Sequence, residues 1–385
     1  MKNMQMNRVT VKPEMLDWAC KRSGKSLKNI YDKFPKFELW SSGKANPTLK
    51  QLERFAKATY TPIGFLFLQE PPVEKVPIPD FRTVGNKKYG HPSPNLLDTI
   101  YICQQRQEWY RDFMRISGEK PLQFVNSAAT SDNVEKSAMR IRQTLGFDIE
   151  ERRKMRTWTD ALRSFIAQAD DLGILVMVNG VVGNNNWRKL DVDEFRGFAL
   201  VDNLSPLIFI NGSDTKSAQM FTLAHELAHI WLGQSALSDS QVSDVTGNEI
   251  ERWCNQVAAE LLVPLAVMRD EYQKNKPLSE EANRLARRFK VSTLVILRRI
   301  FDAGGLKKEQ FWKAYNEEVE RLQEISTGSG GDFYLTQGAR LSKRFARALV
   351  ASTLEGQTLY RDAFRMLGFS KLETFRDLGY TLGVV

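Results

Sequence analysis

Two histidines and a glutamate lie close together in the segment His225-Glu226-Leu227-Ala228-His229. Residues four apart on a helix project from the same face, so both imidazoles can bind one ion. Glu226 lies beside the first histidine and can reach a water molecule held by that ion. A zinc ion lowers the pKa of bound water, and a nearby carboxylate can take its proton during attack on a carbonyl carbon. The segment therefore predicts metal-assisted hydrolysis of a peptide bond.

A catalytic zinc usually has a third protein ligand and keeps one position for water. Glu251 is our candidate, because it shares a helix face with small apolar residues, where an unpaired carboxylate would be costly. Asn255, one turn further on, is predicted to accept a hydrogen bond from a ligand imidazole. The alternative for Glu251 is a salt bridge with Arg252 or another basic residue. Glu249, near the helix start, and Glu260, on a different face, are competing ligands.

The nitrogen and oxygen ligands favour zinc, while Mn²⁺ and Fe²⁺ stay open. The chain has three histidines, and two of them stand at this spacing with a glutamate between. The alternative, a solvated helix with incidental histidines, disagrees with the apolar neighbours of the motif. His91 is predicted to be a loop residue, and Cys254 to be buried rather than to bind metal.

Three segments in this region follow the pattern of a known family. They are, in chain order, residues 206–211, 221–229 and 251–264. Over roughly residues 173–265 the sequence resembles the ImmA/IrrE family of metallopeptidases, although Val257 stands where the family usually has Phe. The resemblance implies a minimal gluzincin core in which both motif histidines and the downstream glutamate bind zinc. It also implies substrates that are DNA-binding regulators, often repressors of mobile elements or of stress responses.

The resemblance suggests a role for the strands before the motif as well. In such peptidases an edge strand pairs with the substrate backbone, a form of β-augmentation. Residues 196–201 are our candidate for that strand. The alternative is an ordinary strand of the core.

Periodicity and turn signals indicate the elements that must position these residues. Stretches rich in Ile, Val and Phe predict strands at residues 173–182, 196–201 and 206–210. Apolar residues at helical spacing predict two strong helices, 213–232 and 248–262. We therefore predict an α+β fold that is predominantly helical, with a minimal zincin core, a small sheet and two site-bearing helices, flanked by helical domains.

We divide the chain into five segments. They are a helix-turn-helix-like domain (1–72), a linker with helices (73–155), the zinc metallopeptidase core (156–275), a helical segment packing on the core (276–325) and a C-terminal helical domain (332–385). Gly- and Ser-rich residues 326–331 separate the last two. The basic segment 284–293 is predicted to pack beside the core. The basic helix around 340–347 is predicted to be solvated, with nucleic acid or a protein partner as alternatives.

The N-terminal region resembles the helix-turn-helix of phage-repressor-like proteins, particularly through residues 39–49. Base reading needs exposed polar side chains at the start of the recognition helix. Here residues 33–38 are apolar, interrupted by Pro35 and partly acidic. DNA binding by this region is therefore weighed against a degenerate module for dimerisation or substrate capture, and a homodimer is kept as an expectation.

The composition is that of an ordinary globular protein, with 42% hydrophobic and 26% charged residues. A formal net charge of +9 favours acidic partners, nucleic acid among them, or indicates no more than a solvated basic surface. The sequence has no apolar run long enough to span a bilayer and no apolar core of a secretory signal. Its 3 cysteines are far apart, which fits a reducing compartment. We expect a cytoplasmic protein without a membrane partner.

Two functions follow from these observations. The first is a zinc-dependent endopeptidase of narrow specificity that cleaves a transcriptional regulator in a stress-response or mobile-element circuit. Glu226 is the predicted general base, and a Tyr or Arg from elsewhere is expected as a second donor to the oxyanion. The alternative is a DNA-binding transcriptional regulator or antitoxin-like protein that uses the peptidase fold as a binding module.

Overall fold

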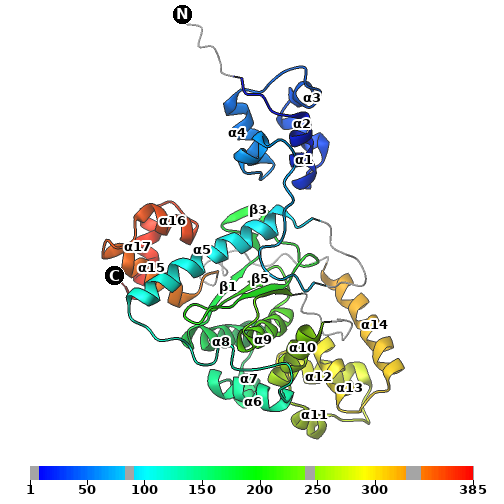
Figure 1. Ribbon diagram of the computed structural model, residues 1–385. Coiled ribbons are helices and arrows are strands. Elements are labelled where there is room, and N and C mark those ends of the chain that lie inside the picture. Colours follow the sequence, from blue (N-terminus) through cyan, green and yellow to red (C-terminus); the bar gives the residue numbers. More distant parts are fainter. Residues whose placement is uncertain (1–7, 83–90, 239–247, 327–339, 385) are drawn as a thin grey trace, which may run out of the picture. The chain divides into compact units, whose positions relative to one another are not determined.

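The computed structural model describes residues 8–82, 91–238, 248–326 and 340–384 (Figure 1). They fall into two compact units, one within residues 8–77 and 91–100, the other within residues 78–82 and 101–384. Helix α5 (Pro94–Ile116) runs from the first unit into the second. Among the helices described, none is long and apolar enough to cross a membrane.

The N-terminal unit is helical. Its elements are α1 (Pro13–Arg22), α2 (Leu27–Lys33), α3 (Phe37–Ser41), α4 (Leu49–Ala58) and the 3₁₀ helix η1 (Ile63–Phe67). Side chains cap two of them: Ser26 accepts from the α2 backbone, and Thr48 forms a capping box with Gln51 at the start of α4. These side-chain caps define where α2 and α4 begin.

The second unit contains a four-stranded sheet in the order β1-β5-β4-β6. The strands are β1 (Leu175–Asn179), β4 (Gly197–Leu200), β5 (Leu207–Asn211) and β6 (Ala236–Ser238). The pair β1 and β5 is parallel, and β4 runs antiparallel to both of its neighbours. A separate hairpin joins β2 (Val181–Val182) and β3 (Asn185–Lys189).

Of the two alternatives for residues 196–201, the edge strand is wrong and the ordinary strand of the core agrees with the structure. Gly197 and Ala199 of β4 lie opposite Ser238 and Ala236 of β6, so β4 is paired on both sides. Strand β6 (Ala236–Ser238) has three residues and comes shortly after a long helix that ends at Leu232. That is too short for period-2 alternation to be recognised in the sequence.

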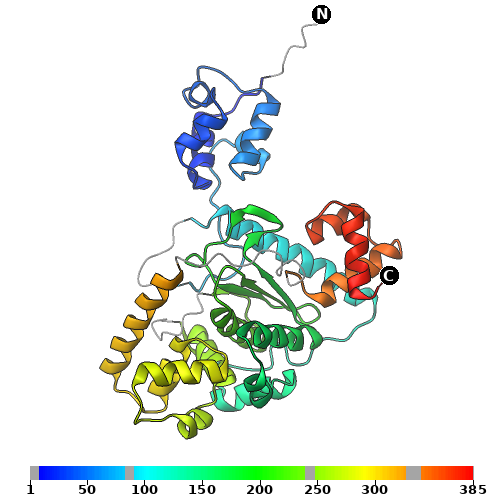
Figure 2. The same ribbon diagram turned by 180° about the vertical axis from the view of Figure 1, so that it is seen from behind.

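Two long helices carry the motif residues. Helix α9 (Lys216–Leu232) packs on β4 and β5, and α10 (Glu249–Leu262) packs on α9. Helix α8 (Trp158–Asp171) lies beside α9 on the same face of the sheet (Figure 2). Thr215 caps the start of α9, and Gly233 ends it in the left-handed conformation.

The other helices of this unit complete the core. They are α6 (Val134–Leu145), α7 (Ile149–Lys154), α11 (Leu265–Glu271), α12 (Leu278–Phe289), α13 (Thr293–Asp302), α14 (Lys308–Ser326), α15 (Lys343–Leu354), α16 (Tyr360–Leu367) and α17 (Leu372–Leu382). Leu285 and Phe289 of α12 are buried in the same core as α9 and α10, so the basic segment 284–293 packs beside these helices. The predominantly helical α+β class is confirmed.

The basic residues around 340–347 are largely engaged within this unit. Arg344 donates to the backbone carbonyls of Asp170 and Asp171, and Arg347 donates to that of Leu382. These two guanidinium groups therefore fasten α15 to its neighbours, a structural use that charge alone did not indicate. Residues 327–331 of the predicted Gly- and Ser-rich break lie outside the described residues.

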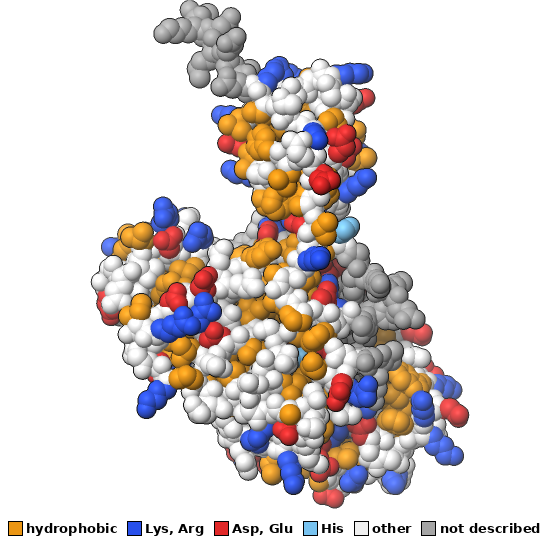
Figure 3. All heavy atoms as spheres, viewed as in Figure 1, with side chains coloured by type: hydrophobic (Ala, Val, Ile, Leu, Met, Phe, Trp, Pro, Cys, Tyr) orange, Lys and Arg blue, Asp and Glu red, His pale blue; other side chains and the backbone are white. Residues whose placement is uncertain are grey.

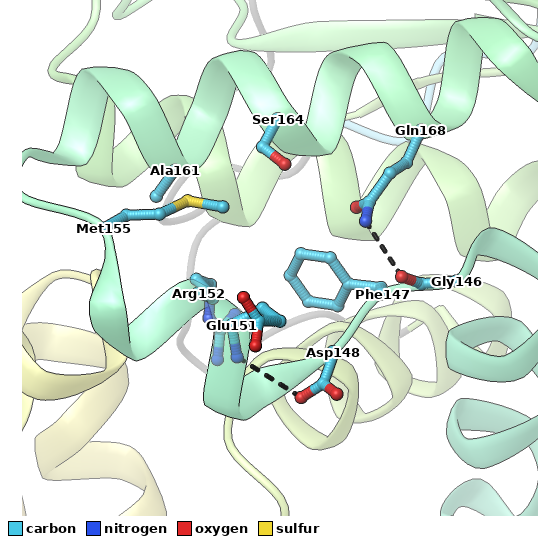
Figure 4. A pocket seen from close by; sticks show the side chains of 9 residues that line it. All are labelled: Gly146, Phe147, Asp148, Glu151, Arg152, Met155, Ala161, Ser164 and Gln168. Atoms are coloured by element: carbon cyan, nitrogen blue, oxygen red, sulfur yellow. Dashed lines mark hydrogen bonds between the residues drawn. The ribbon is translucent and has the colours of Figure 1, made fainter.

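A small cavity of about 90 Å³ lies between α7 and α8 (Figure 4). Arg152 forms part of its wall, is buried, and donates a hydrogen bond to the carbonyl oxygen of Leu262. Burial lowers the pKa of Arg152 to about 9, and the nearby Arg153 and Arg142 act in the same direction. None of the predicted metal or catalytic residues lines this cavity.

Candidate metal centre

Three side chains from α9 and α10 converge on one point. The Nε2 atoms of His225 and His229 are 3.1 Å apart; Oε2 of Glu251 lies 3.3 Å from the first, and Oε1 of the same carboxylate lies 3.1 Å from the second. With bonds of about 2.0–2.1 Å, a tetrahedral zinc ion holds its ligand atoms about 3.3 Å apart. The triangle therefore has the dimensions of three zinc ligands. We call these residues the metal triad.

Helices α9 and α10 bring the triad together because they pack against each other, and the residues at their contact are buried. The motif brings His225 and His229 to one side of α9, one turn apart, and Asn248 caps the start of α10 just before Glu251. Helix α9 is enclosed by the sheet and by α10, so its residues 219–232 are all buried. The triad itself is fully buried. A buried group of this kind needs a partner of opposite charge.

The charge state of Glu251 suits a metal ligand. Burial opposes ionisation, but the two imidazoles outweigh it and lower the pKa of Glu251 to about 2. The carboxylate is therefore ionised at neutral pH, as metal binding requires. Glu251 contacts the two histidines and makes no ion pair with Arg252, its neighbour on the exposed side of α10.

Glu226 lies in the same buried space with no good partner. Within the described residues, neither of its carboxylate oxygens has a hydrogen bond of good geometry. Burial raises the pKa of Glu226 to about 8; Glu251 acts in the same direction, while His225 and the Ser238 hydroxyl oppose it. A metal-bound water molecule would satisfy such a group beside three ligand atoms, and the charge of a bound cation would favour its ionised form.

Asn255 orients the first histidine. The Nδ1 atom of His225 lies 2.9 Å from the Oδ1 atom of Asn255. An amide oxygen only accepts, so the imidazole carries its proton on Nδ1 and presents the Nε2 lone pair to the triad.

Asn255→Ala is therefore expected to weaken zinc binding about 10- to 100-fold while leaving the fold intact, because the imidazole loses the group that fixes its tautomer. A competition titration with a chromophoric chelator measures the affinity. Gln256→Ala, an exposed change at the next position of α10, is the matched control. Equal zinc affinities for the two variants would show that Asn255 does not orient His225 for metal binding.

Two residues of the centre were not predicted from the sequence. Ser238, in β6, places its Oγ 3.2 Å from Nε2 of His229 and 3.4 Å from the Glu251 carboxylate. Gly197, opposite it in β4, leaves open the space beside Glu226: a Cβ atom there would lie 3.3 Å from the Glu226 carboxylate and 2.5 Å from Cγ2 of Thr222. The only signal for Gly197 was a glycine within a predicted strand.

Gly197→Ala is expected to destabilise the second unit by about 1–3 kcal/mol, because the added methyl group overlaps Thr222 and the carbonyl oxygen of Phe209. Calorimetric unfolding measures the change. Gly64→Ala is the control, since a Cβ atom at Gly64 meets nothing within 4 Å. If the Gly197→Ala protein unfolded at the wild-type temperature, β4 would accommodate the methyl group without loss of stability.

The competing ligands lie elsewhere. Glu260 forms an ion pair with Arg299 and accepts a hydrogen bond from the Leu265 backbone, and Glu249 is exposed. Cys254 is buried outside the triad, and His91 is an exposed residue in a bend before α5. Within the described ranges, the triad is the one group of at least three His, Cys, Asp or Glu whose ligand atoms lie close enough to share an ion.

Comparison with known families agrees with this geometry. Residues 169–301, from the end of α8 to α13, match the IrrE N-terminal-like domain, a peptidase family. Residues 341–380, which cover most of α15 to α17, match a domain of unknown function. A comparison with curated proteins finds no match. Residues 169–301 are therefore similar to the IrrE N-terminal-like domain and have a metallopeptidase-like fold, with a buried His-His-Glu group that could bind a metal ion.

Proposed function

We propose that this chain is a zinc-dependent endopeptidase of narrow specificity. The observation that carries the proposal is the triangle of two imidazole nitrogens and one carboxylate at zinc-ligand separations, with a second, orphaned carboxylate beside it. Two nitrogens and one oxygen suit zinc, and a triad with one open position is typical of catalytic rather than structural sites.

The residues around the triad have separate roles in this chemistry. When bound, zinc would lower the pKa of a water molecule and polarise the scissile carbonyl. Glu226 takes the proton of the water and passes it to the leaving amine, while Asn255 holds the ring of His225. The Ser238 hydroxyl lies 3.2 Å from Nε2 of His229 and 3.4 Å from the Glu251 carboxylate, and it is our candidate to donate a hydrogen bond to the developing oxyanion.

The proposed substrate is a DNA-binding regulatory protein, captured through the N-terminal unit. Helix α3, at the place of a recognition helix, has five residues and spans about 7.5 Å. Its exposed positions include Glu38 and Leu39, and Leu27 and Tyr31 of α2 are also exposed. Lys28, Lys33 and Lys36 are exposed beside them, so this surface mixes apolar, acidic and basic side chains. Such a mixture favours a protein contact over base reading in a DNA groove.

The charge distribution supports a protein substrate as well. On the face shown in Figure 3, basic and acidic side chains are interspersed, with hydrophobic ones between them. Nucleic-acid sites gather Lys and Arg on one face or along one helix. On this face, therefore, the Lys and Arg side chains that contribute to the net charge of +9 are spread rather than clustered.

Peptide cleavage tests the proposal even while the natural substrate is unidentified. Zinc-loaded protein is incubated with peptides from a digested cellular proteome, and new termini are identified by mass spectrometry. We expect a small set of cleavage sites with a common sequence, all of which disappear after chelation. Products that persist after chelation, or no products from any peptide, would contradict the proposed activity.

A further inference from the structure

A segment of the linker adds a strand to the central sheet. The amide of Phe81 donates to the carbonyl oxygen of Leu237 at 3.0 Å, and the amide of Leu237 donates to that of Pro79 at 2.9 Å. Asp80 pairs with Leu237 in a parallel bridge. Residues 79–82, which we call the linker strand, therefore occupy the outer edge of β6.

The alternation of side chains along strands aims Phe81 at the metal triad. Neighbouring residues in adjacent strands point to the same face of a sheet. Gly197 lies opposite Ser238, and Phe81 follows Asp80, the partner of Leu237, so the three form one row across β4, β6 and the linker strand. This row contacts α9. Gly197 lies beside Glu226, and Ser238 lies beside His229. The Phe81 ring lies 6.4 Å from the His229 ring and is inclined to it by 26°.

The linker strand is also held by its own side chains. Arg82 makes two hydrogen bonds to the Asp80 carboxylate, at 2.8 and 2.6 Å, and a third to the carbonyl oxygen of Glu194 at 3.1 Å. The Arg82 side chain is 2% exposed. The segment is therefore seated in a defined place and does not merely pass over the sheet.

The triad, Glu226 and Ser238 are all 0% exposed. A peptide substrate needs a path to them. Among the residues that the structure describes, β6 is paired on both sides, whereas the linker strand is paired with β6 alone, so the linker strand is the simpler element to displace.

We propose that the outer edge of β6 is the binding site for the substrate backbone, and that the linker strand occupies it as an internal competitor. A substrate peptide in extended form makes the same two hydrogen bonds to Leu237 and places an aromatic or large apolar side chain where Phe81 now lies. This inference rests on the proposed peptidase function. The linker strand follows closely on Glu74, which pairs with Arg22 of α1, so a partner that displaces this anchor can release the strand.

Two variants and one control test the pairing without any need for metal or activity. Phe81→Pro removes both the ring and the amide donor, and Phe81→Ala removes the ring alone. Val73→Ala, at a 77% exposed position of the same Pro-rich stretch, is the control. Hydrogen exchange measured by mass spectrometry on peptides that contain Leu237 should be at least about tenfold faster in Phe81→Pro and unchanged in the control. Equal exchange in all three proteins would overturn the proposal.

Access to the centre is measured on the zinc-loaded proteins. Excess chelator should remove zinc about tenfold faster from both Phe81 variants than from the wild type, because the ring no longer covers His229. A free peptide of the sequence Ile-Pro-Asp-Phe-Arg should slow this release in Phe81→Pro, while a scrambled peptide should not. If neither peptide has an effect, the edge of β6 is not a strand-binding site and the proposal fails.

Cleavage assays separate this proposal from the function on which it rests. Both variants should cleave responsive peptides at least about tenfold faster than the wild type. A wild type as fast as the variants would overturn the competitor role. Faster exchange and zinc release without cleavage of any peptide would support the covering strand and overturn the peptidase function.

Discussion

Replacing Glu226 by Gln is expected to lower the rate of peptide cleavage by about 10²–10⁴-fold while leaving the zinc content unchanged. General acid–base catalysis contributes rate factors of this size, and an amide cannot accept the proton of the attacking water. The substitution keeps the shape of a fully buried side chain, so the fold should tolerate it. Single-turnover kinetics on a responsive peptide, with metal analysis of the same samples, measure both quantities.

Two further variants test whether the loss of rate depends on the carboxylate of Glu226. Glu226→Asp keeps the charge but draws it back by one methylene group, so an intermediate rate is expected. Glu249→Gln changes an exposed carboxylate on α10 and should leave the rate unaltered. If Glu226→Gln retained more than about a tenth of the wild-type rate, another group would have to serve as the base.

The second large effect is expected at the third ligand. Glu251→Ala should weaken zinc binding by more than about 100-fold, because loss of a ligand ought to exceed the effect of losing a residue that only orients one. It also leaves two fully buried imidazoles without their anionic partner. Chelator competition gives the affinity, and the upward shift of the unfolding temperature when zinc is added should largely vanish.

Glu249→Ala provides the matched comparison, since Glu249 lies two residues earlier on the same helix and is exposed. It should bind zinc as the wild type does. A Glu251→Ala protein that held zinc within about tenfold of the wild type would show that Glu251 serves as an ion-pair partner of the histidines rather than as a ligand.

The site could be predicted from the sequence where residues of metal-ligand type recur at helical spacing. The spacing of His225 and His229 predicts one helix face, and the placement of Glu251 and Asn255 on a second helix with small apolar neighbours predicts where that helix is buried. Both helices begin and end within about three residues of the predicted positions, because local capping and turn residues define their ends.

The strands around the triad depend on tertiary pairing and could not be predicted in the same way. Strand β6 and the linker strand are each too short to show alternation, and each owes its conformation to hydrogen bonds with a distant segment. Ser238 and Phe81 therefore enter the centre without a sequence signal. The span of β4 was predicted, but the edge role considered for it was wrong for the same reason, since an edge strand differs from a central one only in what pairs beside it.

Metal analysis of the purified wild-type protein tests the central claim most directly. Plasma mass spectrometry gives the stoichiometry, and X-ray absorption at the metal edge gives the ligand atoms. The account predicts about one zinc ion per chain, bound by nitrogen and oxygen only, in keeping with two imidazoles and a carboxylate. A protein that takes up no transition metal when zinc is supplied, or whose metal is bound through sulfur, would contradict it.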